Sequence, residues 1–240
     1  MRSINNIGLL ILFVWASHAS ADGIAVSKIY HPYVNPMEWE LESRTFFREK
    51  DSITGESNDI LQSLGLGHAI SDRVFAEVYL RASDDPVTDD IEWVGIEFEA
   101  LVQLSEQGEY LADYGLLVEY ERDWELNNNE IVVKGLVERE FGRLSVTLNP
   151  GIAYEWGENR QDEFETKLSA MLRYRYHPRF EPSFEVHLGQ VSKMAGPSVG
   201  GRIRLPAPGT SLSYDFGTFF PLDQESSEYT VRLQIEYEFY

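Results

Sequence analysis

Residues 164–176 read FETKLSAMLRYRY, and side chains of two different characters alternate along this stretch. Phe164, Leu172 and Tyr174 share one register, whereas all but one of the intervening positions carry polar or charged residues such as Arg173. A period of two is typical of a β-strand with one apolar face. At about 3.3 Å per residue this strand would be roughly 40 Å long, which exceeds a usual globular strand and suits a tilted membrane crossing.

The same alternation recurs along the rest of the chain. It predicts an all-β protein, a twelve-stranded antiparallel transmembrane β-barrel, and an even strand number is typical of bacterial barrels. Only helices and closed barrels satisfy all their backbone hydrogen bonds in lipid. Besides 164–176, the apolar registers lie in residues 39–47, 64–70, 74–80, 94–102, 114–120, 131–137, 144–156, 180–188, 199–205, 212–216 and 231–239.

The connections between the predicted strands alternate in length, as they do in outer-membrane barrels. Short connections follow even-numbered strands, at residues 71–72, 105–110, 141–142, 177–179 and 206–210. Longer acidic connections follow odd-numbered strands, at residues 50–57, 84–90, 123–129, 157–163 and 221–228. We therefore expect the short turns and both chain ends on the periplasmic side.

The first residues predict export. Residues 1–21 combine Arg2, the apolar run IGLLILFVW and the small-residue sequence Ala19-Ser20-Ala21, which is typical of a cleaved signal peptide. The run is too short for a spanning helix, which needs about 20 residues. We expect residues 22–36 to form a periplasmic N-terminal segment, with residues 29–34 as a lid across the mouth, and residues 37–240 to form the barrel.

Composition excludes several classes of protein. The chain is 43% hydrophobic and 13% aromatic, too high for a disordered protein. Its formal net charge of −20 would repel nucleic acid, and with no cysteine it has neither disulfides nor thiolate metal sites. A soluble lipocalin-like barrel or periplasmic sandwich is the alternative fold, but such proteins turn the apolar face inward and use shorter strands.

Several segments resemble known outer-membrane proteins. EWELE at residues 38–42, GLLVEYE at 115–121 and PRFEP at 178–182 are similar to a group of uncharacterised, porin-like proteobacterial β-barrel proteins. The final IEYEFY resembles the C-terminal signal that the barrel-assembly machinery recognises, although the lipid-facing register ends at Phe239 and Tyr240 is an extra residue. The resemblance implies residence in the outer membrane of a Gram-negative cell, among lipid and lipopolysaccharide, and implies no established substrate.

Charged residues occupy the register opposite the apolar face, so we expect them to line the lumen. On lipid they would cost about 2 to 4 kcal/mol each at the midplane. Acidic candidates concentrate on the first, fourth and fifth strands and basic ones on the eighth, tenth and twelfth. These candidates are Glu38, Glu40, Glu42, Glu97, Glu99, Glu119, Glu121, Arg173, Arg175, Arg202, Arg204 and Arg232.

This segregation of charge predicts a narrow porin-like channel for small polar or cationic solutes, with a field across its constriction. One alternative is a closed structural or surface-interaction barrel, whose lumen is sealed by salt bridges such as one between Arg175 and Glu181. A second alternative is an enzyme at the outer rim.

An enzyme is the weaker prediction, because histidines are few. A Ser-His-acid set would have to use His187 with Glu185 and Ser183, and strand geometry keeps Ser183 too far from His187, so a partner must come from an adjacent strand. The sequence has no HExxH motif and no closely spaced histidine pair, so we expect no catalytic residue, metal or cofactor.

Overall fold

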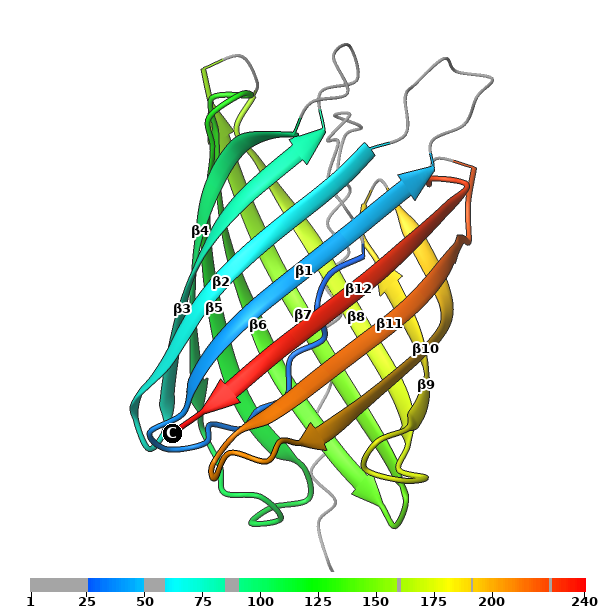
Figure 1. The fold of residues 1–240 in the computed structure, drawn as a ribbon. Helices are drawn as coiled ribbons and strands as arrows, with labels where there is room; N and C mark the ends of the chain where they lie inside the picture. Colours follow the sequence, from blue (N-terminus) through cyan, green and yellow to red (C-terminus); the bar gives the residue numbers. More distant parts are fainter. Residues whose placement is uncertain (1–25, 50–58, 85–90, 159–160, 191, 225) are drawn as a thin grey trace, which may run out of the picture.

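The computed structural model describes residues 26–49, 59–84, 91–158, 161–190, 192–224 and 226–240, so the predicted signal peptide lies outside the described residues. Twelve antiparallel strands close into a barrel, each paired with its neighbours in the sequence and β1 paired with β12 (Figure 1). The strands are β1 (Trp39–Glu49), β2 (Asp59–Ser71), β3 (Val74–Asp84), β4 (Ile91–Gln103), β5 (Asp113–Asp123), β6 (Asn128–Phe141), β7 (Leu144–Gly157), β8 (Glu163–Tyr174), β9 (Glu181–Leu188), β10 (Lys193–Arg204), β11 (Ser211–Pro221) and β12 (Tyr229–Phe239). The predicted fold is confirmed.

The two ends of the barrel differ in their connections. At one end, here called the short-turn end, β6 and β7 are joined by a tight hairpin in which Phe141 pairs with Leu144. Gly142 adopts a φ of 66° there, a left-handed conformation that glycine takes without a steric penalty. Trp39 at the start of β1 pairs with Phe239 at the end of β12 at the same end. The opposite end is called the long-loop end.

Large apolar side chains cover the outside of the wall, because successive residues of a strand point to opposite faces. Aromatic clusters mark two levels: Trp39, Tyr237 and Phe239 stack near the short-turn end, and Tyr154 stacks on Trp156 near the other. No described segment is a helix long and apolar enough to cross a membrane. Exposed residues of the outer belt include Leu41, Leu66, Phe98, Leu148, Ile152, Phe164, Phe184 and Ile235.

One residue of the predicted outer register turns inward. Val94 is buried, with 7% of its surface exposed, whereas its neighbour Trp93 is exposed. The cause is a bulge, because Arg81 pairs with Gly95 and the next residue, Ala82, pairs with Trp93, which leaves Val94 unpaired. Because side chains alternate along a strand, one extra residue moves every side chain beyond it to the opposite face of the sheet from the one that strict alternation predicts.

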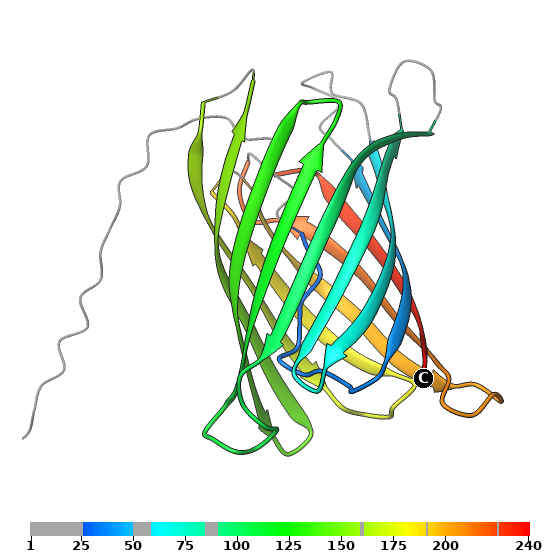
Figure 2. The same ribbon diagram turned by 90° about the vertical axis from the view of Figure 1, so that its left-hand side faces the viewer.

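The N-terminal segment, defined here as residues 26–36, lies inside the barrel (Figures 1 and 2). Val26 packs on Phe46 and Phe219 near the long-loop end, and the segment then descends to Pro36 at the short-turn end. Our expectation of a lid across the periplasmic mouth is therefore wrong for these residues. The lumen of the closed barrel offers hydrogen-bond partners and a small apolar patch, and the segment uses both.

Candidate functional site in the lumen

Tyr30 is the central anchor of the N-terminal segment. Its ring is 4% exposed and packs on Leu117 of β5 and Leu136 of β6, two apolar residues that point into the lumen. Its hydroxyl donates a hydrogen bond of 2.5 Å to Glu99, and the Asn149 side chain binds both its backbone N–H and its carbonyl. Buried polar groups are expensive to leave unpaired, so these contacts favour the inserted position.

The next residues of the segment bind the short-turn half of the wall. His31 bridges two charged groups, since its Nδ1 contacts Glu138 while Arg173 donates to its Nε2. Tyr33 donates to Asp113 at 2.7 Å, and the backbone N–H of Val34 donates to a side-chain oxygen of the β4 residue Gln103 at 2.8 Å. The segment is thus held by side chains of several strands rather than by strand pairing.

Carboxylates form a row across one part of the wall, because the register aligns them. Glu77 of β3 pairs with Glu99 of β4, and Glu99 pairs with Glu119 of β5. On the other side Gly67 of β2 lies between Glu77 and Glu40 of β1. This row, Glu40 to Glu119, is the acidic wall that the sequence predicts on the first, fourth and fifth strands, extended by β3.

Basic side chains lie among the carboxylates of the acidic wall, and they come from the wall itself and from β6. Lys134 of β6 lies 2.8 Å from Glu119, and Arg44 of β1 binds Glu42 at 2.7 Å and lies 3.6 Å from Glu99. Glu121 pairs with Arg81. Close opposite charges offset much of the repulsion within the row, although Glu99 Oε2 is buried and has no hydrogen-bond partner.

The predicted basic wall is also partly neutralised. Arg232 binds Glu185 at 2.8 Å and Asp215 at 2.6 Å, and it donates to the backbone carbonyl of Ser27 in the N-terminal segment. Arg202 pairs with Glu238 and lies 3.6 Å from Glu38. The pattern of charge is thus a set of ion pairs on β9–β12 and a carboxylate excess on β1, β3, β4 and β5.

Two of the basic candidates differ from expectation. Arg175 binds Glu138 and Glu140 of β6, and the partner of Glu181 is Arg173 at 3.6 Å. The predicted Arg175–Glu181 pair is wrong because the backbone N–H of Arg175 bonds to Arg143, which turns its side chain toward β6. Arg204, the last residue of β10, is exposed at the short-turn end.

A cavity of about 440 Å³ remains between the N-terminal segment and the wall formed by β8–β12. Lys28 and His31 line it from the segment, and the wall contributes ion-pairing residues of both signs. Its charged wall residues are Arg173, Glu181, Glu185, Arg202, Asp215, Arg232 and Glu236. A space with this charged lining can accept small polar solutes and disfavours apolar ones.

Sequence reasoning missed the apolar residues of the lumen. Leu117, Leu136 and Phe219 are almost fully buried, and so is Tyr79, whose ring reaches across Gly65 of β2. A signal existed for all four, because each belongs to a run of consecutive apolar residues, such as Val78-Tyr79-Leu80 and Leu116-Leu117-Val118, which breaks strict alternation.

The adjacent-strand partner of His187 is Ser169 of β8, whose Oγ lies 3.0 Å from His187 Nδ1, while Glu185 lies 3.0 Å from Nε2. His187 and Glu185 have no exposed surface, and Ser27 of the segment lies against Ser169 at 3.5 Å. Ser183 instead bonds to Ser198. Ser169, His187 and Glu185 thus form a buried polar network. Of these three residues only Glu185 lines the cavity.

No family model matches the chain, and no curated protein matches its sequence. Among solved structures, the KdgM porin in complex with disordered oligogalacturonate is similar over 84% of this chain and 98% of its own, with 9% identity and a TM-score of 0.53. A bacterial polysaccharide outer membrane secretin (88% and 99% covered, 10% identity, TM-score 0.45) and an anion-selective porin from Comamonas acidovorans (85% and 98%, 8%, 0.40) are less similar.

The chain therefore has the fold of an outer-membrane β-barrel, and the resemblance to one group of proteobacterial proteins stays a prediction. The apolar outer belt, flanked by aromatic residues, fits the lipid-facing surface of such barrels. The protein is an outer-membrane protein.

Proposed function

We propose that the protein is a narrow porin-like channel for small polar solutes, with a preference for cations. The observation that carries the proposal is the cavity of about 440 Å³ beside the N-terminal segment, lined by charged residues. A barrel built only as a structural wall has no need for a charged cavity beside the segment that fills its lumen. The segment reduces the cross-section, so passage is restricted to small solutes.

The preference for cations rests on the acidic wall. Glu40, Glu77, Glu97, Glu99, Glu119 and Glu121 face the lumen on four strands, and among the described residues the cations paired with this part of the wall include Lys28, Arg44, Arg81 and Lys134. A carboxylate excess attracts cations and repels anions. An oligogalacturonate, which the KdgM porin holds in its complex, is a chain of sugar carboxylates, so this wall favours the opposite charge.

Transport is also a better explanation than catalysis. The Ser169–His187–Glu185 network is covered by the segment and faces a second serine, Ser27, rather than open space. We therefore propose that the protein is not an enzyme, and that its charged lumen serves permeation.

Single-channel conductance of the refolded full chain in planar bilayers tests this function. We expect small, stable steps, a salt-gradient reversal potential that indicates cations, and larger steps when residues 26–36 are deleted. A folded barrel that carries no current with or without the segment would instead support the closed structural barrel.

A further inference from the structure

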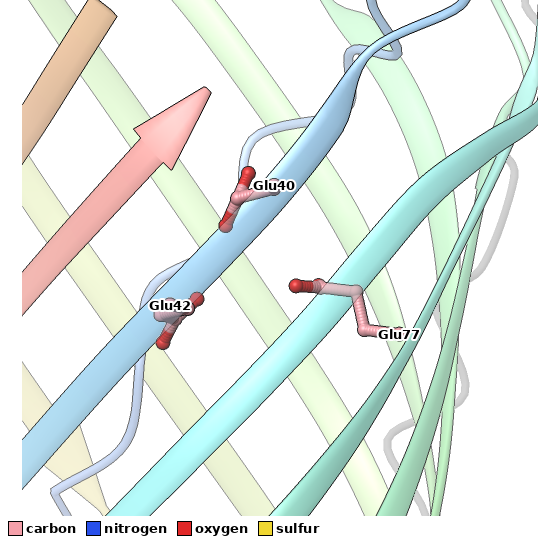
Figure 3. A group of neighbouring side chains, drawn as sticks. All are labelled: Glu40, Glu42 and Glu77. Carbon is pink, nitrogen blue, oxygen red and sulfur yellow. The ribbon is translucent and has the colours of Figure 1, made fainter. Parts of the chain in front are cut away.

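Lys28 of the N-terminal segment places its ammonium group among several carboxylates. Its Nζ lies 2.6 Å from Glu42, 3.0 Å from Glu236 and 3.9 Å from Glu40. Figure 3 shows Glu40 and Glu42 on β1, with the Glu77 side chain reaching toward them from β3, and single oxygens of these three residues lie within 4.8 Å of one another. The Lys28 site, defined as Glu40, Glu42, Glu77 and Glu236, already holds one alkylammonium.

The carboxylates of the Lys28 site are not fully satisfied by protein groups. Glu42 is well paired, since Arg44 and the Tyr79 hydroxyl also bind it, and Tyr79 donates to Glu77 as well. Glu40 is 7% exposed, yet its buried Oε1 accepts no hydrogen bond and has Lys28 as an ionic neighbour at 3.9 Å. An ammonium has three donors, and a buried carboxylate oxygen without a donor is costly, so the site has capacity for a better-placed cation.

The site is open to solutes. Lys28 and Glu236 both line the cavity next to the segment, and 14% of the Lys28 side-chain surface is exposed. Lys28 also belongs to a segment without strand pairing, so its side chain can withdraw without breaking the barrel wall.

We propose that the Lys28 site binds the alkylammonium groups of cationic solutes, and that Lys28 is an internal occupant which such a solute displaces. The proposal deepens the proposed channel function, because it names the ligand class that the cavity selects. Charge-assisted hydrogen bonds from the ammonium to Glu40, Glu42 and Glu236 supply the recognition.

The test is binding of n-butylammonium, which matches the lysine side chain, to the folded full chain in detergent by titration calorimetry. We expect Lys28→Ala to bind it at least tenfold more tightly than the wild type, since the internal competitor is gone. Adding Glu40→Gln and Glu77→Gln to Lys28→Ala should abolish this gain. Lys193→Ala is the matched control, because Lys193 pairs with Asp223 at 3.0 Å outside the Lys28 site, and no gain is expected.

Butan-1-ol, which has the same carbon chain without the charge, should not bind. A folded Lys28→Ala protein that binds no butylammonium, or that binds Ca²⁺ in its place, would overturn the proposal. If Lys28→Ala does not fold, Lys28→Met removes the charge and keeps an unbranched side chain, and the same gain over the wild type is required. The titration needs no ion current, so a silent channel with a binding-competent site would contradict only the proposed transport.

Discussion

Asn149 of β7 holds Tyr30 by both polar groups of its backbone: Tyr30 N donates to Asn149 Oδ1 at 2.8 Å, and Asn149 Nδ2 donates to Tyr30 O at 3.0 Å. The side-chain amide thus makes the two hydrogen bonds that the backbone of a neighbouring strand would make in a sheet. These two hydrogen bonds join residues that are 119 positions apart, and they position the only ring of the segment that contacts both Leu117 and Leu136 among the described residues.

Replacing Asn149 with alanine should loosen the N-terminal segment. Each buried group left unpaired costs about 1 to 3 kcal/mol, so we expect the inserted position to be weakened and single-channel conductance to become larger and noisier. Asn129→Ala is the control, since the Asn129 side chain also makes two hydrogen bonds, with Tyr120 and Trp156, away from the segment. Equal conductance in the two variants would contradict the anchoring role of Asn149.

Leu117 and Leu116 are neighbours that face opposite sides of the wall. Leu117 is 1% exposed under Tyr30, whereas Leu116 is exposed on the outer belt. Leu117→Ala leaves a cavity in a packed contact, so the free energy of unfolding should fall by about 2 to 5 kcal/mol. Leu116→Ala should cost less, and it should leave conductance unchanged. Urea unfolding in lipid vesicles measures both values, and the reverse order would refute the assigned facing.

Gly65 leaves room for the Tyr79 ring. A Cβ at Gly65 would clash with the Tyr79 ring, so Gly65→Ala must displace the ring, and we expect destabilisation of about 1 to 3 kcal/mol from overpacking. Gly135→Ala is the matched control, because its Cβ would meet its nearest neighbour, Pro150, at 3.8 Å. The measurement is the temperature at which each variant unfolds, detected by the shift in gel mobility between the folded and the unfolded barrel. Similar unfolding temperatures for the two variants would show that the Tyr79 ring has room to move.

Charge selectivity should depend on the acidic wall. Converting Glu97, Glu99 and Glu119 together to glutamine removes three negative charges and keeps side-chain size and hydrogen-bonding capacity. We expect the cation-to-anion permeability ratio to fall severalfold, as measured by the reversal potential in a salt gradient. Glu106→Gln, on an exposed turn outside the lumen, should leave the ratio unchanged. A ratio that stays constant in the triple variant would place the selective constriction elsewhere.

The sequence predicts the barrel well because a barrel wall is repetitive. Each strand repeats the same period of two, and lipid outside and water inside leave few alternative assignments. Of the twelve predicted lumen residues, Arg202 and Arg204 are exposed, and the other ten are buried or half-buried. The miss at Val94 comes from one extra residue in β4, which no alternation pattern reveals.

The partners of the lumen charges could not be predicted, because they depend on distances around a closed wall. The apolar residues of 164–176 face outward, so the alternating Arg173 and Arg175 are expected to face the lumen. Their ion-pair partners, Glu181 for Arg173 and Glu138 for Arg175, depend on the path of the chain at the end of β8. Likewise no sequence pattern predicts that Tyr30 of the N-terminal segment bonds to Asn149 and Glu99, because these residues lie far along the chain.

By itself the sequence determined the strand number, the facing of each strand and the acidic character of the lumen, since these follow from local periodicity and composition. Only the tertiary structure decided that residues 26–36 fill the lumen, that Lys28 reaches the carboxylates of β1 and β12, and that a cavity remains beside β8–β12. The physical reason is closure: a barrel brings together side chains from its first and last strands, and it creates an enclosed space whose occupant is selected by the sum of many distant contacts.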